Sequence, residues 1–196
     1  MADFHQNGVI STLHNLSNRS LEEIEKELRE YSKDAPIELI LPSLYSELDG
    51  EALKNIVSCL SDVKYLNHIT IGLDNADKSE FIKAKKFFAS LNQSHSIIWN
   101  DSPKMKKLDS DLKKIGIAPN QSGKGKNVWY CMGYTYSRNE ASSVALHDCD
   151  ITTYNRDLLA RLVYPVSNPN FNYEFCKGYY PRIREGALSG RVTRLL

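Results

Sequence analysis

The sequence predicts an α/β fold with a mostly parallel sheet that is covered by helices on both faces. Short apolar runs rich in β-forming residues alternate along the chain with segments whose apolar residues recur at helical spacing. Strands that are separated by helices imply right-handed βαβ crossovers, which place neighbouring strands parallel to one another. The 196 residues, 41% hydrophobic and 25% charged, have the composition of one well-buried globular domain.

The individual elements follow from caps, periodicity and turn residues. Ser20 and Glu23 form a capping-box pattern that starts the first helix, and Pro42 is expected to end the first strand after the apolar run 37–41. The later helices and strands repeat the same alternation. The expected helices are 20–32, 47–63, 79–91, 104–115, 127–137 and 155–165, and the expected strands are 37–41, 68–74, 95–101, 142–148 and 172–180.

Composition also limits the kinds of binding partner and the cellular compartment that we expect. Lys and Arg number 25 while Asp and Glu number 24, so no overall field favours nucleic acid or an anionic membrane. The four cysteines have no C-x-x-C spacing and are expected to be reduced thiols. The first residues lack the pattern of a secretory leader, and no apolar run approaches the roughly 18 residues that span a bilayer. We therefore expect a cytoplasmic protein without nucleic-acid or membrane partners.

Polar side chains collect where the predicted strands end, and open α/β sheets bind ligands beyond the carboxyl ends of their strands. The three clusters are 42–47, 74–77 and 148–150. Asp148 and Asp150 are expected to reach one Mg²⁺ or Mn²⁺ ion, whereas Cys149 between them should point the other way. A zinc site built from His147 and Cys149 is the rival interpretation, but no second pair at ligand spacing supports it.

Two glycine-containing segments add phosphate-binding chemistry. Gly123-Lys124-Gly125-Lys126 precedes a helix, where free backbone N–H groups and lysine charge can meet a phosphate, although the spacing of a Walker A loop is absent. Gly190-Arg191-Val192-Thr193 offers backbone N–H groups, a guanidinium and a hydroxyl, a combination suited to a small phosphorylated acceptor. A solvated turn and a solvated hairpin are the alternative interpretations of these segments.

Together these motifs resemble GT-A glycosyltransferases, and more narrowly the glucosyl-3-phosphoglycerate synthase family and its mannosyl relatives. The family's P-A-L-N-E-E loop is resembled by 42–47, its D-S-G-S-T-D loop by 74–77, its G-K-G loop by 123–125, its D-S-D metal motif by 148–150 and its G-G-R-V-T loop by 189–193. These segments follow one another in the same order as the family's motifs and with comparable spacing. In the first loop, Tyr45 and Ser46 replace the central Asn-Glu of the family's pattern.

The resemblance implies a metal-dependent transfer of a sugar with retention of configuration. UDP-glucose is the expected donor, and 3-phosphoglycerate or a similar small phosphorylated molecule is the expected acceptor. Asp148, Asp150 and Lys124 would be catalytic, with Mg²⁺ or Mn²⁺ held by the two aspartates. The implied contacts to the nucleotide sugar are Pro42, Ser43, Leu44, Glu47, Asn75, Lys124, Asp148 and Cys149, and the implied acceptor contacts are Gly190, Arg191, Val192 and Thr193. The resemblance also leaves a homodimer open.

Members of the family continue beyond the G-R-V-T loop, so the resemblance implies a chain that is cut short. We expect an N-terminal helical extension over 1–35, followed by a GT-A nucleotide-sugar-binding domain over 36–196 whose acceptor half is missing. A non-catalytic nucleotide-sugar-binding module and a sugar nucleotidyltransferase are the competing classes. Nucleotidyltransferases usually carry a glycine-rich loop with a basic residue after the first strand, which the segment 41–47 lacks.

Overall fold

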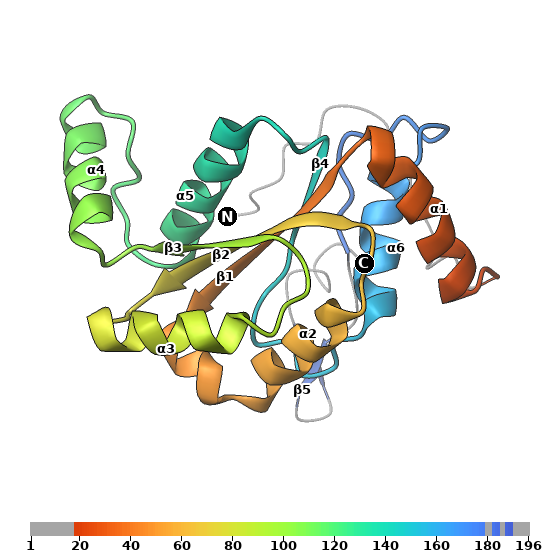
Figure 1. The fold of residues 1–196 in the computed structure, drawn as a ribbon, viewed down its shortest axis with the longest axis horizontal. Helices are drawn as coiled ribbons and strands as arrows, with labels where there is room; N and C mark the ends of the chain where they lie inside the picture. The colour runs from red at the N-terminus through yellow and green to blue at the C-terminus, as the bar shows by residue number, and fades with distance from the viewer. Residues whose placement is uncertain (1–17, 179–181, 185–186, 190–196) are drawn as a thin grey trace.

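Four parallel strands form the central sheet of the structure, a computed structural model that describes residues 18–178, 182–184 and 187–189. In sheet order they are β3 (His95–Trp99), β2 (Leu66–Asp74), β1 (Ile37–Leu44) and β4 (Ser143–Leu146), as Figure 1 shows. Each neighbouring pair in this sheet is parallel. The predicted α/β class with a parallel sheet, which is consistent with a GT-A fold, is therefore confirmed.

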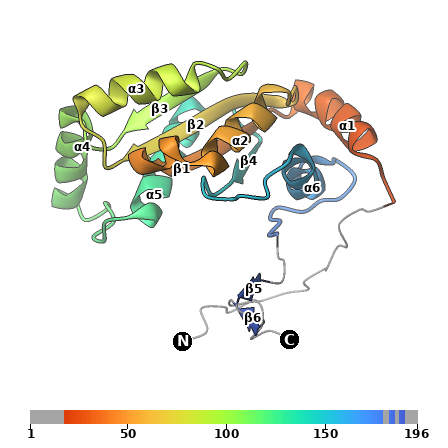
Figure 2. The ribbon, with the colours of Figure 1, turned by 90° about the horizontal axis from the view of Figure 1, so that it is seen from below.

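Helices precede, connect and follow these strands along the chain. They are α1 (Leu21–Asp34), the 3₁₀ helix η1 (Tyr45–Asp49), α2 (Glu51–Ser61), α3 (Lys78–Phe88), α4 (Pro103–Lys114), α5 (Lys124–Arg138) and α6 (Arg156–Ser167). A second, antiparallel sheet contains β5 (Arg182–Arg184) and β6 (Ala187–Ser189). In Figures 1 and 2, α4 and α5 lie at one side of the parallel sheet, and α1 and α6 lie side by side at the other. Within the described ranges, no helix is long and apolar enough to cross a bilayer.

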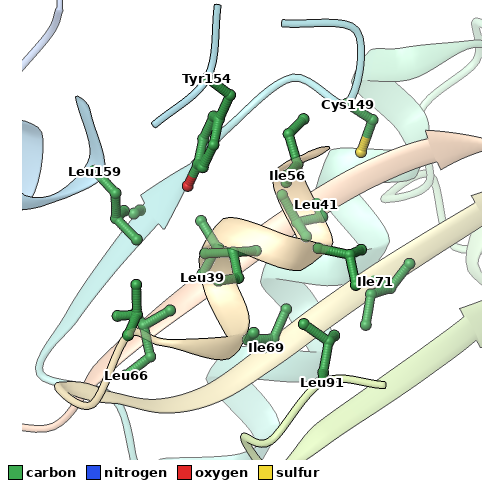
Figure 3. Packing of buried hydrophobic residues seen from close by; sticks show 14 of the residues in the cluster. Leu39, Leu41, Ile56, Leu66, Ile69, Ile71, Leu91, Cys149, Tyr154 and Leu159 are labelled. Atoms are coloured by element: carbon green, nitrogen blue, oxygen red, sulfur yellow. The ribbon is translucent and has the colours of Figure 1, made fainter. Parts of the chain in front are cut away.

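One face of the sheet packs against α1, α2, α3 and α6. Alternate residues of β1 and β2, such as Leu39 and Ile69, face this layer and are fully buried, because side chains alternate between the faces of a strand. Figure 3 shows these side chains packed with Ile56 of α2 and Leu159 of α6. Full burial of one such side chain contributes roughly 1.5–3 kcal/mol to stability. This cluster therefore holds the strands whose carboxyl ends form the candidate site.

The other face of the sheet is covered by α5 through a close and partly polar interface. The Asn127 side-chain Nδ2 donates to the backbone carbonyl of Gly72 at 2.9 Å. A Cβ atom at position 72 would lie only 1.7 Å from Asn127 Oδ1, so only glycine allows this approach. About two turns further along α5, the hydroxyls of Thr70 and Thr135 are 3.4 Å apart. The missing side chain at Gly72 thus brings the first turns of α5 against the sheet.

The first strand continues past Pro42, contrary to the prediction that Pro42 ends it. The pairing of β1 with β4 stops at Ile40 and Leu146, where the backbone N–H of His147 donates to the Ile40 carbonyl at 3.2 Å. Peptide groups two residues apart point to the same side of a strand. The N–H that Pro42 lacks would therefore have pointed to the side that β4 has already left, so its absence costs no ladder bond. Pro42 instead keeps its register with Gly72 of β2.

The strand predicted at 172–180 is wrong over its described part, 172–178, which has no regular secondary structure. Asn172 has a φ of 48°, in the left-handed region that breaks a strand. Phe171 packs edge-on against Tyr164 of α6, with ring centroids 5.8 Å apart. Within the segment, Tyr173 packs against Phe171 with ring centroids 6.2 Å apart, and Phe175 is 76% exposed, so neither aromatic side chain takes part in strand pairing. Residues 179 and 180 lie outside the described residues.

Most helix boundaries differ from the prediction by one to three residues, and two differ in a way that affects the candidate site. The helix expected at 47–63 is divided at Gly50, whose φ and ψ of −75° and 147° are extended, into η1 and α2. The helix expected from Asn127 begins earlier, at Lys124, because Gly123 with a φ of 108° precedes it. That earlier start places Lys124 and Lys126 inside a helix.

The first helix shares the core of the sheet. Ile24 and Leu28 of α1 are fully buried in the main apolar cluster. Arg156 of α6 pairs with Glu25 of α1 at 3.2 Å. The predicted division of the chain at residue 35 stays a prediction, since these contacts describe packing and not independent folding.

Candidate functional site

A pocket of about 410 Å³ opens at the carboxyl ends of β1, β2 and β3. Small-molecule sites usually have volumes of roughly 300–1,000 Å³, and parallel α/β sheets bind ligands at this edge. The strand ends, α4 and the first turns of α5 contribute its walls. The lining residues are Leu44, Asp74, Asn75, Asn100, Asp101, Met105, Lys106, Asp109, Ser122, Gly123, Lys126, Asn127 and Tyr130.

Carboxylate and amide groups line the strand-end wall of this pocket. Asn100 Nδ2 donates to Asp74 Oδ1 at 2.7 Å, and Asp101 accepts the backbone N–H of Ala76 at 3.1 Å. Burial raises the pKa of Asp74 above its ordinary value, and the neighbouring Asp101 acts in the same direction. Asn75 turns the chain away from β2 with a φ of 56°. This wall therefore presents oxygen acceptors that suit N–H or O–H groups of a ligand.

Asp109 joins the two helices that form the opposite wall. Its carboxylate accepts hydrogen bonds from Lys113 at 2.8 Å, from Lys126 at 2.6 Å and from the Tyr130 hydroxyl at 2.5 Å. These three donors hold the pKa of Asp109 below its ordinary range, so it stays ionised at neutral pH. Among its described residues, α4 buries no side chain fully. Asp109 is thus the principal polar link between α4 and α5.

Lys124 and Asp148 form an ion pair next to this pocket. Gly123 lines the pocket and Lys124 follows it directly, while Asp148 comes two residues after the end of β4. The two side chains are 53% and 44% exposed, so a ligand can reach both. The structure therefore brings together a lysine and an aspartate that lie 24 residues apart in the sequence.

The segment after β4 alternates between core and solvent. Cys149 is 2% exposed and packs in the main cluster, whereas Asp150 is exposed and Asp148 is partly exposed. The prediction that Cys149 points away from the two aspartates is confirmed by this burial. Burial raises the pKa of the Cys149 thiol, so it remains protonated. A ligand contact from Cys149 would involve its backbone, and its predicted contact to the nucleotide sugar stays a prediction.

The chemistry of this segment fits a hard divalent cation that takes few ligands from the protein. Asp148 and Asp150 offer accessible carboxylates, and Mg²⁺ is usually held by one or two carboxylates together with waters and substrate phosphates. Over the described residues, no group of three or more His, Cys, Asp and Glu side chains gathers at one point.

The zinc alternative gains no support from the structure. His147 is 3% exposed and packs edge-on against Tyr154, with ring centroids 5.4 Å apart. Burial lowers the pKa of His147 to about 4, so the imidazole is neutral at pH 7. Although His147 and Cys149 both face the core, the described residues supply no further ligand beside them.

The loop after β1 is shaped by Glu47. Its Oε2 accepts the Ser43 hydroxyl at 3.1 Å and the backbone N–H of Leu44 at 2.9 Å. Pro42 and Ser43 are buried, whereas Leu44 is 40% exposed and lines the pocket. Of the residues predicted from the resemblance in this loop, Leu44 lies at the pocket and Glu47 positions its backbone.

Several pocket residues lie outside the predicted set, and the predicted acceptor residues lie outside the described chain. Asn100 and Asp101 follow β3 and could have been found by applying the strand-end rule to that strand. The contribution of Asp109 and Tyr130 depends on how α4 packs against α5, for which the sequence carries no local signal. Gly190, Arg191, Val192 and Thr193 are not among the described residues.

Comparison with known proteins identifies relatives of one kind. No family model matches the chain. The chain is 48% identical over 195 residues to the glucosyl-3-phosphoglycerate synthase of Persephonella marina, a match that covers 100% of the chain and 48% of that protein. It is 35% identical over 196 residues to the glucosyl-3-phosphoglycerate synthase of Methanococcoides burtonii, covering 98% of the chain and 48% of that protein. The chain spans about half the length of the curated relatives it matches. The predicted resemblance is therefore confirmed, and the chain is a homologue of about half of a glucosyl-3-phosphoglycerate synthase.

Proposed function

We propose that this chain forms the nucleotide-sugar-binding part of a retaining glycosyltransferase that moves glucose from a nucleoside-diphosphate glucose to 3-phosphoglycerate. The names of the two relatives support the reaction. The observation that carries the proposal is the position of the Lys124–Asp148 pair directly beside the strand-end pocket. A nucleoside in the pocket would extend its diphosphate toward the start of α5 and the two aspartates after β4.

The residues of the pocket have separate roles in this proposal. Asp74 and Asp101 accept hydrogen bonds from the base or the ribose, and Leu44 contributes an apolar contact. The first backbone N–H groups of α5 have no partner within the helix and carry a partial positive charge, which favours phosphate there. Lys124 adds a full positive charge at the same end of the helix.

Asp148 and Asp150 would hold Mg²⁺ or Mn²⁺ in this proposal. When bound, the ion stabilises the negative charge that develops on the diphosphate leaving group. Lys124 adds a second cationic contact to that leaving group, an effect that is largest where charge grows in the transition state. The acceptor phosphate is assigned by the resemblance to Gly190 through Thr193, and retention of configuration rests on the same resemblance.

A thermal-unfolding panel tests the proposal directly. UDP-glucose, GDP-glucose and ADP-glucose are each added with and without Mg²⁺, with glucose alone and 3-phosphoglycerate alone as controls. A ligand at 100 times its dissociation constant adds about 2.7 kcal/mol to the free energy of unfolding. Stabilisation by at least one of the three donors that increases with Mg²⁺ is expected, with UDP-glucose the first donor to be compared. No stabilisation by any of them would contradict the proposal.

A pair of aspartate variants shows whether the effect comes from the metal motif. Asp150→Asn should remove the Mg²⁺-dependent part of the stabilisation, because it takes one carboxylate from the proposed ion. Asp111→Asn is the matched control, since Asp111 is a partly exposed aspartate of α4 that pairs with Lys107 and Lys114. Equal responses of the two variants would assign the Mg²⁺ effect to some other part of the surface. Transfer of labelled glucose to 3-phosphoglycerate, measured with the same preparations, tests the reaction itself.

A further inference from the structure

Two oppositely charged side chains of the candidate site already neutralise one another. The Lys124 ammonium contacts Asp148 Oδ1, and both side chains are about half exposed. Lys124 lies in the first turn of α5, which packs on β1 and β2, and Asp148 follows β4, so the pair links this helix to the segment after β4. The carboxylate that would hold a metal ion therefore has a cationic partner from within the chain.

The neighbouring lysine of the same helix has a different partner. Lys126 lies about 200° around the helix axis from Lys124, because successive residues are about 100° apart. Its ammonium is 2.6 Å from Asp109 Oδ1 on α4, and its side chain is 21% exposed. Of these two lysines, Lys124 alone contacts the segment that carries the metal motif in the described structure.

We infer that Lys124 is an internal counter-ion that makes metal binding at Asp148 depend on a bound nucleotide. This inference rests on the proposed function. A divalent cation and the Lys124 ammonium compete for Asp148, because two cations at one carboxylate repel each other. Asp150, which is exposed, then remains as a single carboxylate, and one carboxylate with waters is a weak site for Mg²⁺ or Mn²⁺.

A nucleoside diphosphate removes this competition. Its phosphate oxygens give Lys124 another anionic partner and give the cation additional oxygen ligands. The half-exposed lysine side chain can move from Asp148 to a phosphate by a change of rotamer, without any movement of α5. Metal and nucleotide should therefore bind with positive coupling, and by linkage each should raise the affinity of the other by the same factor.

The test measures Mn²⁺ binding from the electron paramagnetic resonance signal of the free ion. The chain is titrated alone, with saturating UDP and with saturating GDP. Lys124→Met should bind Mn²⁺ alone about five- to tenfold more tightly than the wild type, the size expected for releasing a half-exposed ion pair and a like charge. Lys124→Arg keeps the charge and should match the wild type. Lys126→Met removes an equal charge from the same helix turn and should change the Mn²⁺ affinity less than about twofold.

In the wild type, the nucleotide should tighten Mn²⁺ binding, and this coupling should shrink in Lys124→Met. Equal Mn²⁺ affinities of Lys124→Met and wild type, or undetectable Mn²⁺ binding by both, would overturn the inference. A Lys126→Met variant that gains as much affinity as Lys124→Met would overturn it too, because general charge and not a specific contact would then be responsible. Failure of UDP and GDP to bind any of the proteins would contradict the proposed function. The Mn²⁺ affinities of the wild type and Lys124→Met without nucleotide would still show whether Lys124 competes with the ion for Asp148. Matching unfolding midpoints show that the variants are folded.

Discussion

Replacing Gly72 with alanine should force α5 away from the sheet. The new Cβ would lie 1.7 Å from Asn127 Oδ1 and 2.5 Å from Cys131 Sγ, both far inside contact distance. Asn127 is 3% exposed and Cys131 is fully buried, so neither side chain has free space to rotate into. Either the helix shifts or the hydrogen bond from Asn127 to the Gly72 carbonyl breaks.

The expected cost follows from these two contacts. Overpacking of a filled interior costs about 1–3 kcal/mol. Loss of the buried Asn127–Gly72 hydrogen bond adds about 0.5–1.5 kcal/mol. Replacing a glycine reduces the entropy of the unfolded chain, which returns about 0.4–1 kcal/mol. Together these ranges give a fall of about 0.5–4 kcal/mol in the free energy of unfolding of Gly72→Ala, with a central value of about 2 kcal/mol.

Urea unfolding, followed by circular dichroism, measures this change. Gly133→Ala is the matched control, because it is the same substitution in the middle of α5, where an added Cβ would meet no heavy atom of the described residues within 4 Å beyond its own helix backbone and chain neighbours. Gly133→Ala should raise stability by about 0.5–1 kcal/mol through helix propensity. A Gly72→Ala protein within about 0.5 kcal/mol of the wild type would refute the close packing of α5 on β2.

Three other perturbations test the site and its support. Asp109→Asn should lower the free energy of unfolding by about 1–2 kcal/mol and speed amide hydrogen exchange in α4, because it weakens three hydrogen bonds at once. Unchanged exchange in α4 would contradict the role of Asp109 in joining α4 to α5. Burial lowers the pKa of His68 from 6.5 to about 4, so stability should be complete above pH 6.5 and fall toward pH 4, by at most about 1.4 kcal/mol per pH unit. His68→Gln should reduce that slope in denaturant titrations without abolishing it, because burial lowers the pKa of His147 to about 4 as well, and an unaltered slope would show that His68 does not contribute. Lys124→Ala should weaken UDP by about 1.5–3 kcal/mol in calorimetry and uridine much less, whereas equal losses would place the lysine away from the phosphates.

The strand and helix alternation could be predicted from the sequence because each signal is local. Caps, apolar periodicity and turn residues lie within a few positions of the element that they define. The continuation of β1 past Pro42 could not be predicted in this way, because it depends on where β4 leaves the sheet, about 100 residues later. The strand predicted at 172–180 is wrong for a related reason: Phe171 packs on Tyr164 of α6 and Tyr173 packs on Phe171, and the sequence pattern alone does not distinguish such packing from strand pairing.

The residues of the candidate site also fall into two groups, those that could be predicted from local sequence signals and those that could not. Residues at or just beyond the end of a strand, such as Leu44, Asn75 and Asp148, could be predicted because the fold class fixes where strand ends meet. Asp109 and Tyr130 could not, since both lie within helices and reach the pocket only through the packing of α4 on α5. The chemistry of the strand ends was therefore accessible from the sequence, while the helical wall required the three-dimensional structure.

The two lysines at the start of α5 show why one boundary residue matters for function. A helix beginning at Asn127, as predicted, would leave Lys124 and Lys126 in a loop without defined directions. Gly123, with its φ of 108°, starts the helix at Lys124 instead, and the contact at Gly72 fixes that turn against β2. Helical geometry then sends the two ammonium groups to opposite sides, one to Asp148 after β4 and the other to Asp109 on α4. A glycine on β2 and a glycine before α5 thus determine which lysine can compete with a metal ion, although neither glycine carries a reactive group.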